Sequence, residues 1–377
     1  MGVFGPEEHG IPEENEEYLN RQIITYIGNK RSLLPFIGAG LSKVLPRLNR
    51  KTIKTFDVFS GSGIVARYLK HYSSKIIAND LEKYSEVINR CYLSNVSEIN
   101  MGELLDYREK LLAKLKEENL KPGFIAKLYA PRGGTVICGE DRVFYTYRNA
   151  CYIDTARDCI EEVPDEYRKY FLAPLLAEAS VHSNTSGVFK GFYKDSKTGV
   201  GKFGGNAGEA LARILGDITM PFPVFSSFEC EYEVRRGDAN VIIDSVDDVD
   251  LAYIDPPYNQ HPYGSNYFML NLIVDHAEPG NISSVSGIPE GWNRSWYNKK
   301  ARAYSSFRDL VERIRAKFLL VSFNSEGFIT HGEMVDLLNR LGKLEVLETT
   351  YNTFRGGRNL KKRGIHVREY LYLLEKA

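Results

Sequence analysis

The sequence lacks the features that would place it in a membrane or outside the cell. No stretch approaches the roughly 18 consecutive apolar residues that a membrane-spanning helix needs. The first twenty residues carry six glutamates and no Lys or Arg, unlike a secretory signal. We therefore expect an intracellular, cytoplasmic protein without membrane partners.

Metal-binding and disulfide patterns are also missing. The five cysteines are an odd number and include no CxxC pair, which argues against a disulfide framework or a Cys-rich zinc site. Four of the histidines, His182, His261, His276 and His331, have no metal-like spacing. We expect reduced, mostly structural thiols and no metal.

The charges balance overall but are unevenly distributed along the chain. The 377 residues contain 49 basic and 49 acidic residues. Residues 21–54 and 355–368 contain basic residues without acidic ones, whereas residues 237–260 contain six aspartates and no basic residue. This pattern fits an enzyme that holds a polyanion beside a pocket for an amine-bearing ligand. Ordinary solvated surface is the alternative for each run.

The hydrophobic pattern predicts an α/β fold. A strand at 51–59, a helix at 64–72 and a strand at 75–79 form a βαβ opening. Helices are predicted at 305–316, capped by Ser305 or Ser306, and at 331–341, capped by Thr330. Further strands are predicted at 231–235, 250–254, 317–323, 344–351 and 367–374. Since the last two form a hairpin, we expect a mostly parallel, doubly wound sheet with antiparallel C-terminal strands.

The middle of the chain is predicted to be an inserted, mainly helical domain. Helices are expected at 102–119, 151–163, 166–181 and 206–217. The predicted organisation is an acidic tail at 1–20, with disorder as the default, a catalytic domain at 21–96 and 229–377, and the insert at 97–228.

A glycine-rich turn follows the first strand. Asp57–Gly63 reads DVFSGSG, and such glycines let a ligand approach the backbone at a helix N-terminus. Asp80 ends the next strand 19 residues after Gly61, near the offset at which an acid reaches ribose hydroxyls. Position 66 is Ala, so the full dinucleotide motif is absent. A tight turn with a capping carboxylate would explain the same residues.

A second motif, Asp255-Pro256-Pro257-Tyr258, follows the apolar strand Leu251–Ile254. The prolines fix the backbone as extended, so the Asp255 carboxylate and the Pro256 carbonyl can accept from one amine. Tyr258 offers a face for stacking a flat base. An exocyclic nucleobase amine fits all three groups, and a chance turn with a packing tyrosine is the alternative.

These motifs resemble the N6-adenine DNA methyltransferases in the arrangement in which the cofactor motifs come first, then the target-recognition insert, then DPPY. The resemblance is carried by YIGNK at 26–30, FSGSG at 59–63, Asn79-Asp80 and DPPY at 255–258. It implies a site-specific, adenine-specific DNA methyltransferase of Rossmann-like fold that uses S-adenosylmethionine and releases S-adenosylhomocysteine. The insert then recognises the DNA target.

The resemblance also implies roles for single residues. Asp255, Pro256 and Tyr258 are implied in catalysis, with the target adenine flipped out of double-stranded DNA. Position 26 is Tyr where some members have Trp. The implied cofactor-binding residues are Tyr26, Lys30, Phe59, Gly61, Gly63, Asp80, Asp238 and Asp255.

Partners follow from the same resemblance. Double-stranded DNA is expected as substrate, a cognate restriction endonuclease as a further partner, and the bacterial nucleoid as location. Basic loops are predicted to contact DNA at Pro131–Gly134, Lys190–Lys202 and Arg294–Arg302, with ordinary solvated loops as the alternative. The basic hairpin loop Arg355–Arg363 is predicted to bind phosphate, and His261 and Tyr263 are candidates for the target pocket. The alternatives are an RNA adenine methyltransferase and a non-catalytic nucleic-acid-binding subunit of the same fold.

Overall fold

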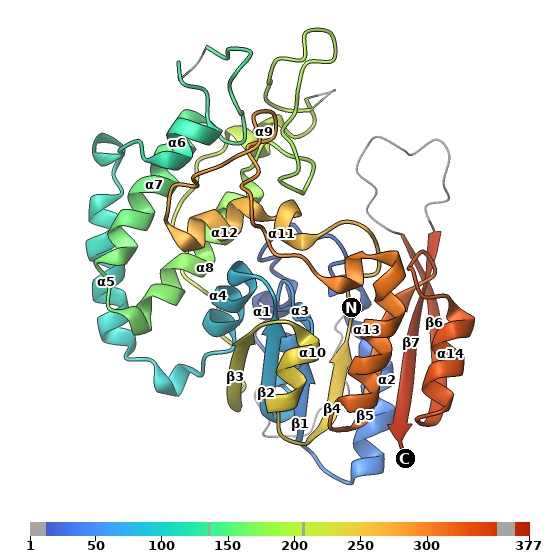
Figure 1. Cartoon of the computed structure of the whole chain (residues 1–377). Coiled ribbons are helices and arrows are strands. Elements are labelled where there is room, and N and C mark those ends of the chain that lie inside the picture. The colour runs from blue at the N-terminus through green and yellow to red at the C-terminus, as the bar shows by residue number, and fades with distance from the viewer. Residues whose placement is uncertain (1–12, 135, 206–207, 353–365) are drawn as a thin grey trace.

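A seven-stranded sheet forms the catalytic half of the protein (Figure 1). The computed structural model describes residues 13–134, 136–205, 208–352 and 366–377. The strands lie in the order β3 (Glu231–Arg236), β2 (Ser73–Asp80), β1 (Ile53–Asp57), β4 (Val249–Ile254), β5 (Ala316–Asn324), β7 (His366–Lys376) and β6 (Gly342–Asn352). The first five are parallel, and β7 is antiparallel to both neighbours. The predicted fold class is confirmed.

Helices cover both faces of the sheet. In β5, Phe318 and Leu320 point to one face, while Leu319 and Val321 point to the other, as strand geometry requires. The first face packs against α2 (Leu34–Leu48) and α3 (Ile64–Lys70), and the second against α10 (Ala239–Ile242), α13 (Lys300–Arg313) and α14 (His331–Asn339). Burial on both sides explains the nearly continuous apolar runs of the central strands.

A second hydrophobic core holds the helical part of the protein, drawn above and beside the sheet in Figure 1. Its helices are α4 (Lys83–Tyr92), α5 (Met101–Lys114), α6 (Phe124–Tyr129), α7 (Tyr147–Glu161), α8 (Asp165–Val181), α9 (Leu211–Leu215), α11 (Tyr263–Asn266) and α12 (Phe268–Asp275). Short 3-10 helices lie at Arg31–Leu33, Val96–Glu98, Glu117–Asn119, Ile243–Ser245 and Trp296–Asn298. This core also includes Tyr18, Ile23 and Ile24 near the N-terminus, and α12 follows β4, so segments far apart in the sequence build it.

The large helical segment leaves and re-enters the sheet at one place. The side chain of Asn95 donates to the carbonyl of Cys230 at 2.9 Å and accepts from its N–H at 3.3 Å. Glu229 accepts from the N–H and the hydroxyl of Ser97, at 2.8 and 2.6 Å. These bonds form a clasp, Asn95–Ser97 with Glu229–Cys230, at the two ends of the segment. The predicted boundaries at 97 and 228 lie beside it.

Two of the predicted helices need correction. The helix predicted from 305 begins at Lys300, and Ser305 donates to the Arg302 carbonyl inside it instead of capping it. The helix predicted at 206–217 is described only as Leu211–Leu215. Thr330 does cap α14, in a reciprocal capping box with Glu333.

The end of the acidic tail is ordered, contrary to the default. Helix α1 (Glu16–Asn20) packs on the body of the protein, with Tyr18 buried and its hydroxyl bonded to the Tyr92 carbonyl. Glu14 accepts from the Ser226 hydroxyl at 2.6 Å and from the N–H of Ser227 at 2.9 Å. Glu14 therefore makes specific contacts with the body of the protein.

Candidate active site

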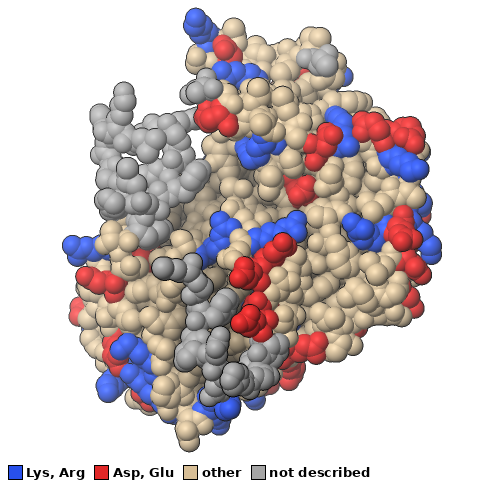
Figure 2. Space-filling model, turned by 180° about the vertical axis from the view of Figure 1, so that it is seen from behind, with Lys and Arg blue, Asp and Glu red and all other residues tan. Residues whose placement is uncertain are grey.

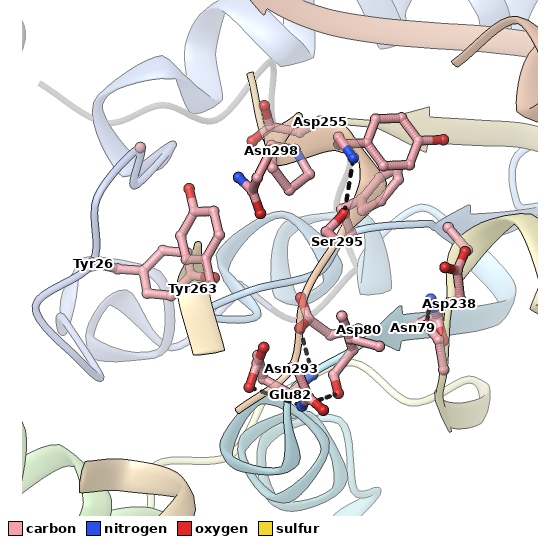
Figure 3. A pocket seen from close by; sticks show the side chains of 17 residues that line it. Tyr26, Asn79, Asp80, Glu82, Asp238, Asp255, Tyr263, Asn293, Ser295 and Asn298 are labelled. Atoms are coloured by element: carbon pink, nitrogen blue, oxygen red, sulfur yellow. Dashed lines mark hydrogen bonds between the residues drawn. The ribbon is translucent and has the colours of Figure 1, made fainter. Parts of the chain in front are cut away.

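A cavity opens where the parallel strands end (Figure 3). It lies at the carboxyl ends of β1, β2, β3 and β4, and the strand order reverses between β1 and β4. Open α/β sheets bind ligands at such a reversal. The lining residues are Tyr26, Gly28, Phe59, Asn79, Asp80, Leu81, Glu82, Gly237, Asp238, Ala239, Asp255, Pro257, Tyr263, Asn293, Ser295, Tyr297 and Asn298.

Five of the predicted site residues meet in this cavity. Tyr26, Phe59, Asp80, Asp238 and Asp255 line it together, although they are spread over 230 positions of the chain. The other predicted residues, Lys30, Gly61, Gly63, Pro256 and Tyr258, are not among its lining residues. Their contacts with a cofactor or base remain predictions.

The glycine-rich turn directly follows Phe59, which lines the cavity. Gly61 and Gly63 have left-handed φ angles of +51° and +75°. A Cβ atom on Gly61 would lie 2.8 Å from a ring carbon of Tyr26, so only glycine fits there. The Gly61 N–H donates to Asp80 Oδ2 at 2.8 Å. The turn is thus fixed by the acid that ends the neighbouring strand.

Asp80 and Asp238 present carboxylates from adjacent strand ends. Asp80 also accepts from the N–H of Glu82 at 2.9 Å, and burial raises the pKa of Asp80 to about 6. Asp238 caps α10 by accepting from the N–H of Asn240 at 2.9 Å. Each oxygen still has a lone pair left, so both acids can accept from a ligand in the cavity.

The Asp255 carboxylate pairs with a buried lysine. Its Oδ2 atom lies 2.9 Å from Lys30 Nζ. Burial raises the pKa of Asp255 to about 6, although Lys30 acts in the opposite direction. The Lys30 side chain is only 5% exposed, and Lys30 lies behind the acid and outside the cavity wall. Among the hydrogen bonds of the described residues, none reaches the Pro256 carbonyl, which leaves it available as an acceptor.

Tyr258 lies just beyond the carboxyl end of the central strand β4. Its ring meets the Phe323 ring edge-on, with centroids 6.3 Å apart. Its carbonyl accepts from the Phe328 N–H at 3.0 Å. The DPPY segment is therefore anchored to the loop after β5.

A stack of tyrosines joins the N-terminal block to the helical part. Tyr26 stacks on Tyr263 and Tyr267, with centroid distances of 5.0 and 4.9 Å. The Tyr267 hydroxyl accepts from the Ile27 N–H, and the Tyr263 hydroxyl donates to the Ile27 carbonyl. Tyr263, a candidate for the target pocket, thus lines the cavity and supports Tyr26.

Sequence reasoning missed Glu82. Its carboxylate accepts from the amides of Asn271 on α12 and Asn293, at 2.6 and 3.2 Å. Burial raises its pKa to about 7. Glu82 follows the recognised Asp80 by two positions, and that proximity was the only signal available.

The segment from Asn293 to Asn298 forms another missed wall. Tyr297 meets Phe59 edge-on at 5.2 Å and donates to Asn240 Oδ1 at 2.8 Å. These residues overlap Arg294–Arg302, which the sequence assigned to DNA contact. One side of the segment lines the cavity, and the other side faces solvent. On the solvent side, Trp296 is 49% exposed and Lys299 Nζ lies 4.3 Å from the centre of its ring.

The other predicted DNA loops are partly described. In Lys190–Lys202, Lys190, Lys194 and Lys197 are exposed. Burial lowers the pKa of His261, and the charge of Lys190 adds to the effect, which places this loop near the DPPY segment. In Pro131–Gly134, the Arg132 side chain is 66% exposed. Arg355–Arg363 lies outside the described residues.

Part of the basic run at 21–54 is paired with acidic side chains in the fold. Lys43 and Arg47 contact Glu345, and Arg50 contacts Asp250, so this part of the run follows the ordinary-surface alternative. Figure 2 shows basic and acidic side chains interspersed over one face of the molecule. Charge along the sequence therefore does not locate the DNA-binding face.

None of the helices formed by the described residues is long and apolar enough to cross a bilayer. In the same part of the chain, no group of three or more His, Cys, Asp or Glu side chains is arranged to hold a metal ion.

Comparison with known proteins adds independent information. The model of the D12 class N6 adenine-specific DNA methyltransferases matches residues 26–282. The Type II methyltransferase M.CviAII of Paramecium bursaria Chlorella virus 1 is 31% identical over 365 residues, covering 93% of this chain and 98% of the relative. The Type II methyltransferase M.NlaIII of Neisseria lactamica is 31% identical over 94% of this chain and all of the relative. The modification methylase LlaI of Lactococcus lactis is 27% identical over 93% of this chain and 55% of its own length.

Proposed function

The chain belongs to the D12 class of N6 adenine-specific DNA methyltransferases, and from this membership we propose that it methylates adenine flipped out of a specific double-stranded DNA sequence, using S-adenosylmethionine. The observation that carries the proposal is the position of Asp255 and the free Pro256 carbonyl beside a cavity lined by Asp80 and Asp238. The first two supply acceptors for an amine, and the second two supply acceptors for a nucleoside.

The residues that line the cavity suit the chemistry of the cofactor. Asp80 and Glu82 would accept from ribose hydroxyls, Asp238 would accept from the adenine amine, and Phe59 and Tyr26 would supply apolar surface. The excess of carboxylates also suits a sulfonium cation. When bound, the cofactor supplies an electrophilic methyl group.

Asp255 and Pro256 would prepare the target amine. The lone pair of adenine N6 is delocalised into the ring, so the nitrogen is a poor nucleophile. Two acceptors that draw its hydrogens out of the ring plane favour a tetrahedral nitrogen. Asp255 Oδ1 is available for one of these bonds, because Lys30 holds Oδ2. The proton lost from the methylated amine goes to Asp255 or to water.

Tyr258 would stack on the flipped adenine. Extrusion of a base costs a few kcal/mol for unpairing and unstacking, and contacts in the pocket must offset this cost. The exposed Trp296 with its cations, and the lysines of Lys190–Lys202, are proposed to contact the displaced strand and phosphates.

The alternatives are weaker on the same observations. An RNA methyltransferase would use the same pocket, but the family is DNA-specific by description. A non-catalytic subunit would not need an intact Asp255. The relatives named Type II methyltransferase or modification methylase support a role in protecting DNA from a cognate restriction endonuclease.

Mass spectrometry of nucleosides tests the proposal. The protein is incubated with S-adenosylmethionine and either unmethylated genomic DNA or total RNA, and Asp255→Ala is treated in parallel. We expect N6-methyldeoxyadenosine in DNA alone, and a loss of at least about a hundredfold in the variant. Methylation of RNA only, methylation of cytosine, or a fully active variant would each contradict the proposal.

A further inference from the structure

A buried ion-pair cluster lies behind the Asp255 carboxylate. Lys30 Nζ is 2.9 Å from Asp255 Oδ2 and 3.6 Å from Glu369 Oε1. The side chain of Glu369 is 1% exposed, and its Oε1 atom accepts from the Ser322 hydroxyl at 2.6 Å. Its Oε2 atom is buried without a hydrogen-bond partner. We call Lys30, Asp255 and Glu369 the Lys30 cluster.

The direction of β7 brings Glu369 to this place. Because β7 runs antiparallel to β5, its first residues lie at the edge where the parallel strands end, and Glu369 pairs in register with Asn324, the last residue of β5. Glu369 does not line the cavity, and its side chain reaches Asp255 only through Lys30.

Burial of a second carboxylate here needs a reason. A lysine and one aspartate would already form a neutral pair, and the added buried acid gives the cluster one net negative charge. Uncompensated buried charge is costly, so packing alone would favour an apolar residue at 369. Lys30 is shared between two carboxylates. It therefore neutralises less of the negative charge on Asp255 than it would if it paired with Asp255 alone.

Building on the proposed function, we propose that Glu369 is a positioning residue for methyl transfer: it holds Lys30 from behind, and Lys30 fixes Asp255 by Oδ2 so that Oδ1 stays available to the target amine. The hydrogen bond from the Ser322 hydroxyl holds the Glu369 side chain in place. Through this chain of contacts, the C-terminal strand takes part in the geometry of the DPPY motif.

Other titratable groups also face Asp255. They come from β1, β4, the DPPY segment and α11, and they are Asp57, Tyr253, Tyr258 and Tyr263. Burial raises the pKa of each of them, and all but Asp57 are neutral around pH 7 even without that shift. The charged groups that shift the pKa of Asp255 are Lys30, which lowers it, and Glu369, which raises it. Removal of either charge should therefore change the pKa of Asp255.

The substitution Glu369→Gln tests the proposal, because it removes the negative charge of the side chain and keeps its shape. In Glu369→Gln, the negative charge that raises the pKa of Asp255 is gone, so that pKa falls. Asp255 has to be ionised to accept from the target amine. The acid limb of the pH profile of kcat should therefore move to lower pH by about one unit. At pH 8, kcat should fall about tenfold through lost positioning, with the KM for S-adenosylmethionine unchanged.

Two further variants separate charge from structure. Glu369→Asp keeps the charge but shortens the side chain, so kcat should fall while the acid limb stays in place. Glu348→Gln makes the same chemical change at an exposed position of β6 and should behave as wild type. If Glu369→Gln keeps the wild-type kcat and acid limb, or loses kcat without moving the limb, the inference is wrong. If Glu369→Gln does not fold, an unchanged kcat in Glu369→Asp overturns it.

An infrared titration separates this inference from the proposed function. The carboxyl band of Asp255 is assigned by its absence in Asp255→Asn, and its midpoint is compared between wild type and Glu369→Gln. A lower midpoint in the variant supports the cluster even if the wild type methylates no nucleic acid, which would contradict the proposed function alone. An unchanged midpoint overturns the inference.

Discussion

Glu82 should make the protein less stable as the pH rises, and Glu82→Gln should remove this effect. The side chain is 2% exposed, and burial raises its pKa from an ordinary 4.5 to about 7. The folded protein therefore holds this proton at a pH where the unfolded chain has lost it. The resulting destabilisation is nearly absent at pH 4, about 1 kcal/mol at pH 5 and about 3 kcal/mol at pH 8. A neutral glutamine can still accept from Asn271 and Asn293 through its carbonyl oxygen.

Urea denaturation of the cofactor-free protein at pH 5 and pH 8 measures this difference. We expect Glu82→Gln to be more stable than wild type by up to about 3 kcal/mol at pH 8, and by about 1 kcal/mol or less at pH 5. Glu109→Gln, at an exposed position of α5, is the matched control and should show no difference. A variant that is less stable at pH 8, or equally stabilised at both pH values, would refute the reasoning. Weaker S-adenosylmethionine binding by the stabilised variant would show that the cost is kept for function.

Two further predictions concern the turn and the exposed aromatic. Gly61→Ala places a Cβ atom 2.8 Å from the Tyr26 ring at a φ of +51°, so it should cost about 1–2 kcal/mol of stability and weaken cofactor binding in calorimetry. Gly139→Ala, whose Cβ atom would meet nothing within 4 Å, should do neither, and equal behaviour of the two variants would contradict the prediction. Trp296→Ala should lower DNA affinity about tenfold without changing cofactor binding, as measured by fluorescence anisotropy and calorimetry. Unchanged DNA affinity would remove this segment from the DNA interface.

The strand ends could be predicted from the sequence because their signals are local. Apolar runs followed by Gly, Asp or Pro marked the ends of β1, β2 and β4, and parallel strands bring such ends to one edge. Asp80 and Asp255 were therefore recognised from the residues, Asp238 was implied by the family resemblance alone, and all three line one cavity. The antiparallel β7 was also predicted, because only a loop separates it from β6.

The rest of the site depends on contacts that no local pattern reveals. Asn293 reaches Glu82 across 211 positions, and Lys30 turns out to lie behind Asp255. Helix α12 reads FMLNLIVD, a short apolar run that fits a strand as well as a helix, and packing against α4 and α8 decides the outcome. The missed cap at Ser305 has a similar cause, since α13 starts earlier, directly after the residues that wall the cavity.

The clasp between Asn95–Ser97 and Glu229–Cys230 has a consequence for how this architecture can change. Because the two ends of the helical segment are held together, its length adds little to the entropy of closing it, and each doubling costs only about 0.6 kcal/mol. The sheet is thus insulated from insertions and deletions in the segment. Because Tyr263 on α11 lines the cavity and the Asn271 amide on α12 donates to Glu82, a change in the segment has to preserve the side of the shared core that packs against these two helices.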